Sequence, residues 1–128
     1  MPGFYDAADA STVSTLLAAI SAANTAAATS GSGAWMDTQP VDGKIIVIMS
    51  LGALTGSLAG KMQVADDANG TNAVDVSGAT FATGVANTAQ RLVVYADGLA
   101  KRYLGFVGTI VTGPVLIGVA AIACPKYV

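Results

Sequence analysis

The stretch Leu58-Ala59-Gly60-Lys61-Met62-Gln63-Val64 alternates between apolar and polar side chains. Successive side chains of an extended strand point to opposite faces, so Leu58, Met62 and Val64 would share one face. Lys61 and Gln63 would share the other. A period of two is typical of a half-buried β-strand and not of a helix. We therefore expect a strand here.

Similar segments follow one another from Trp35 onward. Lys44–Leu51 (KIIVIMSL) is apolar at most positions, which predicts an interior strand buried on both faces. Its two faces would carry Ile45, Val47 and Met49 on one side and Ile46, Ile48 and Ser50 on the other. Further strands are expected at residues 73–76, 80–85, 87–95, 102–111 and 115–123. Roughly seven to eight short antiparallel strands, with turns about every 8–12 residues, predict a mainly β fold, either a β-sandwich or a jelly roll.

Residues 1–34 show a different pattern. Val13, Leu16, Leu17 and Ile20 recur at helical spacing among many alanines, which predicts a short helix over about residues 10–27. Residues 29–33 (TSGSG) have the composition of a flexible hinge. The sequence therefore predicts an N-terminal helical arm and hinge, 1–34, followed by a β-domain, 35–128.

A helix with so little charge needs a surface to pack on, since short isolated helices are marginal in water. The hinge would let that surface belong to another subunit, although docking on its own domain is the alternative. Aromatic residues often dominate interface energies. The candidate partner-binding residues are Phe4, Tyr5, Val13, Leu16, Leu17, Ile20 and Trp35. Core packing is an equally good interpretation of Trp35.

Composition narrows the classes of function. Charged residues make up 11% of the chain, against about 25% in typical domains. A surface this short of charge favours self-association, and we expect a homo-oligomer, a trimer rather than a dimer. The net charge of −2 gives no basic surface for nucleic acid.

Catalysis is not expected. Without any histidine, neither a Ser-His-Asp nor a Cys-His arrangement can form. The single cysteine, Cys124, lies in an apolar segment and is interpreted as a small buried hydrophobe. The sequence therefore predicts no enzyme, no cofactor and no catalytic or metal-ligating residue.

One turn offers a cluster of oxygen ligands. Asp66, Asp67, Asn69 and Asn72 surround Gly70, superficially like a calcium loop. The EF-hand pattern needs a glutamate at its twelfth position, and the chain contains none. A solvated hairpin turn is the simpler interpretation.

Two uncharged stretches, residues 45–60 and 103–125, raise a membrane alternative. The second is long enough to span a bilayer as a helix. Its β-branched content and the Gly113-Pro114 pair in its middle instead favour two strands around a turn. A small membrane protein such as a phage holin remains the alternative, and no membrane partner is expected.

Several short motifs occur in order between residues 35 and 123. They are Asp37-Thr38-Gln39, Val41–Val47 (VDGKIIV), Gly52–Leu58 (GALTGSL), Met62–Asp67 (MQVADD), Asn87–Arg91 (NTAQR) and Lys101–Val107 (KRYLGFV). This order resembles small virion proteins of tailed bacteriophages, the capsid decoration, cement or minor capsid proteins. Residues 1–34 do not match that pattern, and Cys124-Pro125-Lys126 stands where the family commonly ends in a Gly-x-Pro sequence.

The resemblance implies a bacteriophage structural protein that binds the outside of an assembled capsid as an oligomer. Its partner would be the major capsid protein, and its location the capsid surface of the virion, after synthesis in the host cytoplasm. A ligand-binding β-module of a virion is a further alternative.

Overall fold

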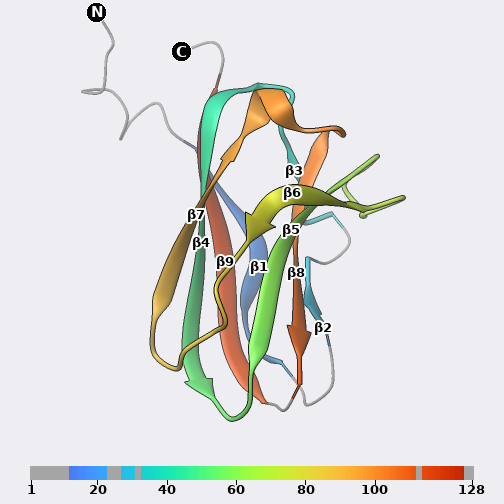
Figure 1. Ribbon diagram of the computed structural model, residues 1–128. Helices are drawn as coiled ribbons and strands as arrows, with labels where there is room; N and C mark the ends of the chain where they lie inside the picture. The colour runs from blue at the N-terminus through green and yellow to red at the C-terminus, as the bar shows by residue number, and fades with distance from the viewer. Residues whose placement is uncertain (1–11, 23–26, 31–32, 112–113, 126–128) are drawn as a thin grey trace, which may run out of the picture.

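The computed structural model describes residues 12–22, 27–30, 33–111 and 114–125. These residues form strands in two antiparallel sheets that pack face to face (Figure 1). The strands are β1 (Thr12–Ala22), β2 (Ala27–Thr29), β3 (Met36–Asp37), β4 (Val41–Leu54), β5 (Leu58–Ala65), β6 (Val74–Thr80), β7 (Ala89–Tyr95), β8 (Tyr103–Ile110) and β9 (Val115–Pro125). A 3-10 helix, Ala96–Gly98, follows β7.

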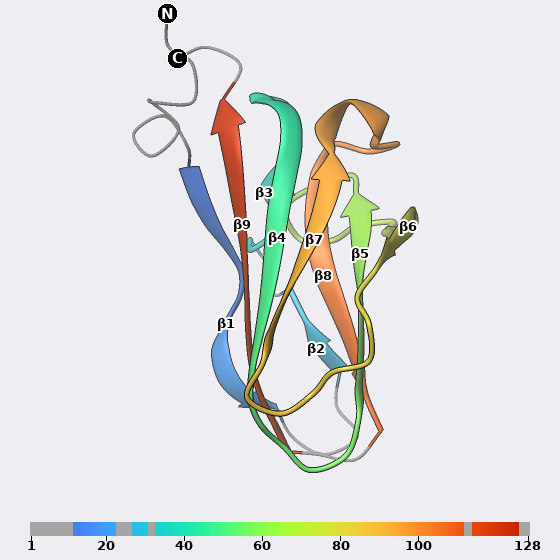
Figure 2. The same cartoon turned by 60° about the vertical axis from the view of Figure 1, so that its left-hand side comes forward.

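The strand order identifies the architecture. The first sheet has the order β1-β9-β4-β7, and the second has the order β2-β8-β5-β6, with β3 also paired to β8. The layers are seen side by side in Figures 1 and 2. The chain repeatedly crosses from one sheet to the other, as from β4 to β5 and from β7 through β8 to β9, which is the arrangement of a jelly roll. The predicted mainly β sandwich or jelly roll is confirmed.

The core lies between the two sheets. Ile45 and Met49 from β4 meet Met62 and Phe106 from the second sheet, and all four side chains are fully buried. Phe106 also contacts Phe81 edge to face, with ring centroids 6.0 Å apart. The alternation predicted for β5 is confirmed, because Leu58, Met62 and Val64 are buried while Lys61 and Gln63 are half-buried.

The strand predicted at Lys44–Leu51 is present as an interior strand, but the predicted burial of both its faces is wrong. This segment lies within β4, between β9 and β7. Ile45, Val47 and Met49 are fully buried, but Ile46 and Ile48 are only half-buried and Ser50 is exposed. The reason is that, among the described elements, the second sheet covers only one face of the first.

The predicted N-terminal helix is wrong. Residues 12–22 form strand β1, which pairs antiparallel with β9. Two register shifts interrupt this pairing, between Thr15 and Leu17 and between Leu17 and Ile20. Because such bulges break the alternation of a strand, the neighbouring Leu16 and Leu17 are both buried. The bulged strand thereby reproduces the spacing that suggested a helix.

The described residues at the start of the expected hinge are hydrogen-bonded to the second sheet. Residues 27–29 form β2, which pairs with β8. Next to it, the backbone amide of Ser30 donates to the carbonyl of Phe106 on β8 at 2.9 Å. The Ser30 side chain is buried, with its Oγ accepting from the Phe106 amide at 2.9 Å. Residues 1–11, 23–26 and 31–32 lie outside the described residues.

The two uncharged stretches contain strands. Residues 103–125 supply β8 and β9, which lie in opposite sheets, as do β4 and β5 over residues 45–60. Within the described ranges, no helix has the length and apolar character needed to cross a bilayer. The two short strands expected at residues 73–76 and 80–85 are instead one strand, β6, followed by a loop.

Candidate interaction surface

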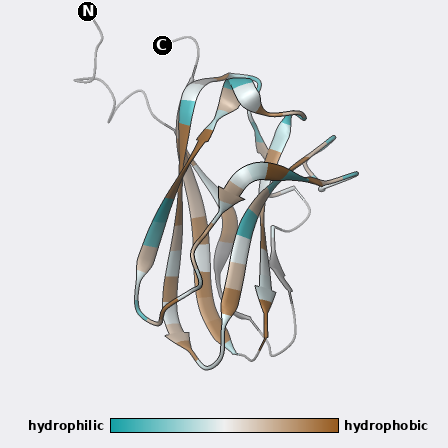
Figure 3. Cartoon of the chain, in the orientation of Figure 1, coloured by the Kyte–Doolittle hydropathy of each residue, from teal (hydrophilic) through white to brown (hydrophobic). Residues whose placement is uncertain are grey.

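The outer face of the first sheet carries an apolar row that crosses all four strands. Backbone pairing aligns Val13 of β1, Ile122 of β9, Ile46 of β4 and Val93 of β7. Val13 is 69% exposed and Val93 38% exposed, whereas Ile46 and Ile122 are half-buried. We call these four residues the apolar row. Figure 3 shows β4 and β9 coloured white to brown over much of their length.

A second row lies beside the first and carries little more charge. Thr15, Ala120, Ile48 and Arg91 are aligned by the same pairing. Leu116 and Tyr95 add large exposed side chains on this face, 44% and 58% exposed. Lys44 sits 5.9 Å from the centroid of the Tyr95 ring, a cation–π contact. Among the described side chains of this face, the charges are Lys44 and Arg91, which are both basic.

The outer face of the second sheet is polar by comparison. Lys61 Nζ on β5 donates to Asp75 Oδ2 on β6 at 3.1 Å, and Gln63 Nε2 donates to Asp75 Oδ1 at 2.7 Å. These bonds, the one from Gln63 first, hold the pKa of Asp75 below its usual value. Since its polar groups are engaged with one another, this face is less suited to apolar contact than the outer face of the first sheet.

Trp35, a predicted partner-binding residue, is buried within its own chain. A Cβ atom added at Gly105 of β8 would collide with the indole ring, and one added at Gly70 would lie 2.8 Å from its Cε2. The amides of Gly33 and Trp35 both donate to the carbonyl of Ala68, at 2.9 and 3.4 Å. The ring is therefore held between β8 and the 66–72 turn, outside the main core between the sheets.

The structure separates the other predicted partner-binding residues. Val13 is exposed, whereas Leu16 and Leu17 are buried in the core. Ile20 lies in β1 opposite Ile117, and its side chain is outside the described part. Phe4 and Tyr5 also lie outside the described residues. Of the predicted set, Val13 is thus the residue that the structure places on an exposed surface.

The 66–72 turn uses its own carboxylates to hold its shape. Asp67 accepts bonds from the amides of Asn69 and Thr71 and from Thr71 Oγ1, at 2.9, 3.2 and 2.7 Å. Asp66 accepts from Asn72 Nδ2 at 2.9 Å and pairs with Lys101 Nζ at 3.2 Å.

These bonds lower the pKa of both carboxyls, mainly through Thr71 for Asp67 and through Asn72 for Asp66. Throughout the described ranges, no three His, Cys, Asp or Glu side chains gather as metal ligands. The geometry is that of a hairpin turn closed by its own side chains.

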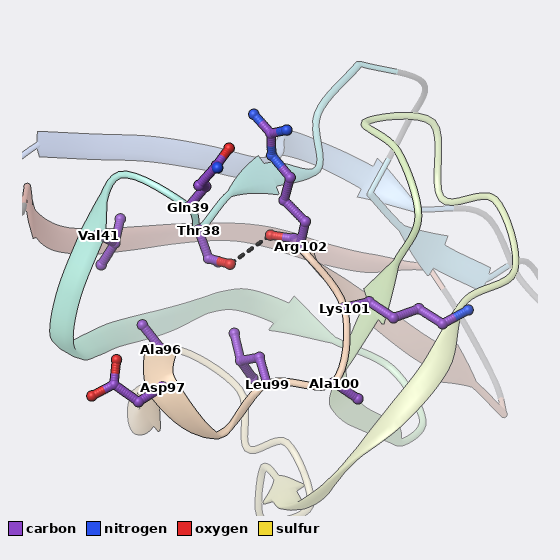
Figure 4. Close-up of a pocket in the computed structure, with 9 residues that line it drawn as sticks. All are labelled: Thr38, Gln39, Val41, Ala96, Asp97, Leu99, Ala100, Lys101 and Arg102. Atoms are coloured by element: carbon purple, nitrogen blue, oxygen red, sulfur yellow. Dashed lines mark hydrogen bonds between the residues drawn. The ribbon is translucent and has the colours of Figure 1, made fainter.

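A shallow hollow of about 440 Å³ lies where the 3-10 helix meets the start of β8 (Figure 4). Its lining is Thr38, Gln39, Val41, Ala96, Asp97, Leu99, Ala100, Lys101 and Arg102. The Arg102 and Lys101 side chains point away from Leu99 and Ala96 in Figure 4.

Both cations of this lining have partners elsewhere. Arg102 holds Asp37 through two bonds, Nε to Oδ1 at 2.8 Å and Nη2 to Oδ2 at 2.7 Å. Lys101 Nζ donates to the Asn72 carbonyl at 2.6 Å. The hollow therefore has a mixed polar and apolar lining, in which Asp97 adds a carboxylate beside Ala96 and Leu99.

In the comparisons with known proteins, no protein-family model, no curated protein and no solved structure matches this chain. The resemblance to phage decoration proteins rests on the sequence motifs alone.

The sequence-based prediction did not include most of the apolar row. Ile46, Ile122 and Val93 belong to segments far apart in the sequence, and their alignment depends on strand pairing. A signal was present in β7, where Arg91, Val93 and Tyr95 alternate with Leu92 and Val94. That alternation places large apolar side chains on an outward face.

Proposed function

We propose that this chain is a non-enzymatic structural protein of a bacteriophage virion. It binds the outside of the assembled capsid and stabilises the joints between capsomers, with the major capsid protein as its partner and the capsid surface as its location. The observation that carries the proposal is the outer face of the first sheet, where the apolar row, exposed at Val13 and Val93 and half-buried at Ile46 and Ile122, has few charges around it. Contiguous apolar surface of this kind usually marks a protein contact.

The fold supports the same class of function. Jelly rolls occur widely in viral capsid proteins, although they also occur in lectins and cupins, so the fold alone does not assign a function. The motif order between residues 37 and 107 supports the virion interpretation independently of the fold.

Capsid stabilisation follows from linkage. A protein that binds the assembled shell and not the free subunits shifts the equilibrium toward assembly by mass action. Burial of the apolar row would contribute roughly 25 cal/mol for each Å² removed from water. Lys44 and Arg91 border this row and favour an acidic partner surface, which would raise the rate of association and fix orientation. Self-association into a homo-oligomer would multiply these contacts through avidity.

The test is to add the purified chain to capsids assembled without it and to measure co-sedimentation and the melting temperature of the shell. Ile48→Lys places a charge in the middle of the outer face of the first sheet. Thr109→Lys is the matched control, because Thr109 is exposed on β8 in the second sheet.

The proposal expects the wild type and Thr109→Lys to bind and to raise the shell's melting temperature. Ile48→Lys should bind at least about tenfold more weakly, a change of about 1.4 kcal/mol. Failure of the wild type to bind, or equal binding by all three proteins, would refute the assignment of this face.

A second candidate is a ligand-binding β-module of a virion, which the hollow beside Leu99 favours. Small-molecule sites are concave and combine apolar surface with a few polar groups; here Val41, Ala96 and Leu99 supply the apolar part of the lining. Nuclear magnetic resonance titration with a library of mono- and disaccharides separates the candidates. Shifts confined to Ala96, Leu99 and Ala100 would support ligand binding, and their absence at millimolar ligand would remove it.

A further inference from the structure

Strand β1 forms one edge of the first sheet. It pairs with β9 on one side, and no other described strand pairs with it on the opposite side. Its sequence over Thr12–Ala22, TVSTLLAAISA, contains neither a charged residue nor a proline. Natural edge strands are usually protected by charge, proline, shortness or cover, because their free amides and carbonyls can template pairing with another chain.

The other edges carry such protection. β7, at the far edge of the first sheet, contains Arg91, and its Gln90 side chain donates to the carbonyl of Ala82 in the adjoining loop at 3.1 Å. β6 contains Asp75, which is engaged by β5. β2 has three residues. Among the described edge strands, β1 is the long one without a charge; its register shifts protect its second half, which leaves Thr12–Thr15 as the regular, uncharged stretch.

We propose that β1 pairs antiparallel with β1 of a second copy of this chain, forming a two-fold dimer in which the two first sheets become one continuous sheet. Across such an axis each residue faces a residue of the same strand. A charged residue near the axis would face a like charge at close range, which destabilises a cross-strand pair.

The absence of charge in β1 meets this requirement. Ser14 and Thr15 supply hydroxyl side chains, which pair favourably across strands.

The register of β1 limits where the contact lies. The shifts at Thr15/Leu17 and Leu17/Ile20 bend the strand, whereas Thr12–Thr15 stays in step with β9. We place the pairing on Thr12–Thr15. Val13, 69% exposed at the end of the apolar row, would then join its row to that of the partner copy.

This geometry gives a dimer where the sequence favoured a trimer. Two identical edges close on each other and leave no free β1 for a third copy, so the interface is isologous and the assembly is finite. The inference goes beyond capsid binding, because it holds or fails whether or not the dimer binds a capsid.

Sedimentation velocity over a concentration series tests the dimer. We expect the wild type to dimerise at concentrations of tens of micromolar or below, about −6 kcal/mol or tighter. Thr15→Lys, at an exposed position of β1, should weaken dimerisation at least tenfold. Thr109→Lys should not change it, nor should Ile48→Lys, which separates dimerisation from capsid binding. A wild-type monomer at 100 micromolar, a stable trimer, or an unaffected Thr15→Lys dimer would overturn the proposal.

Cysteine cross-linking tests the geometry even if Thr15→Lys folds poorly. Single cysteines at Val13, Ser14 and Thr15 are introduced into a Cys124→Ala chain. A residue faces its own copy only at the two-fold axis, where Cα separations of about 4.5–5.5 Å permit a disulfide. The proposal predicts efficient cross-linking at one of these positions and weak cross-linking at the others. Efficient cross-linking of Val93→Cys instead, on the opposite edge strand β7, would place the contact away from β1 and refute the proposal.

Discussion

Replacing Gly105 by alanine should dislodge Trp35. The added methyl group would occupy the space in which the indole ring rests on β8, and Gly70 of the turn closes the other side. If the ring shifts within this slot, overpacking costs about 1–3 kcal/mol. If the ring leaves the slot, the loss approaches the roughly 3–5 kcal/mol of a large aromatic truncation. For a chain of this size, each kcal/mol lowers the melting temperature by about 3–5 °C.

Urea unfolding followed by tryptophan fluorescence measures both consequences, because Trp35 is the single tryptophan. We expect a lower midpoint and, already in the native state, a red-shifted emission as the ring gains water. Gly98→Ala is the control, since an added Cβ there meets no atom within 4 Å. An unshifted emission and a midpoint equal to that of Gly98→Ala would refute the placement of Trp35 between β8 and the turn.

Two further predictions concern buried and surface charge. Val47→Asp should destabilise the fold by about 4 kcal/mol or more, because an unpaired carboxylate would sit at a fully buried position. Ser50→Asp, on the exposed face of the same strand, should cost little in the same thermal melts. Equal losses would contradict the assignment of the buried and exposed faces of β4. Arg102 holds the pKa of Asp37 below its usual value mainly through their paired hydrogen bonds, so the stabilisation is present above about pH 4 and is lost as the pH falls through the folded-state pKa. Asp37→Asn should therefore flatten the loss of stability below pH 4 in acid titrations of the melting temperature; a profile that falls as steeply as that of the wild type would contradict the pairing of Asp37 with Arg102.

The strands with clear periodicity were predictable from sequence. β5 alternates as its residues require, and the composition around Gly113-Pro114 correctly indicated two strands, β8 and β9. The sequence was sufficient to predict these strands, because the alternation of apolar residues and the β-branched composition both favour extended backbone. The strand order was not predictable, because it depends on which distant segments pair.

The N-terminal helix was mispredicted for a physical reason. Val13, Leu16 and Leu17 have the spacing of a helical stripe, and the alanines around them favour helix. Propensity is a weak prior that tertiary contacts override. Pairing with β9 provides the hydrogen bonds, and the bulges at Leu17 let two adjacent leucines reach the core.

The candidate surface was partly predictable. The low charge of the chain indicated that some of its surface is apolar, and Val13 was among the predicted contacts. Its neighbours in the apolar row, Ile122, Ile46 and Val93, come from three other strands, so only the pairing register places them together. Trp35 was ambiguous because an aromatic residue fits an interface and a packed slot equally well. The two glycines that make its slot, Gly70 and Gly105, are distant in sequence.

The most direct test of the proposed function is quantitative mass spectrometry of purified virions and of the infected-cell fractions from which they came. The full chain should be present in the virions in a fixed ratio to the major capsid protein, and it should be depleted from them when Ile48→Lys replaces the wild type. Absence of the wild-type chain from virions, with recovery in the host membrane fraction, would refute the proposed capsid function.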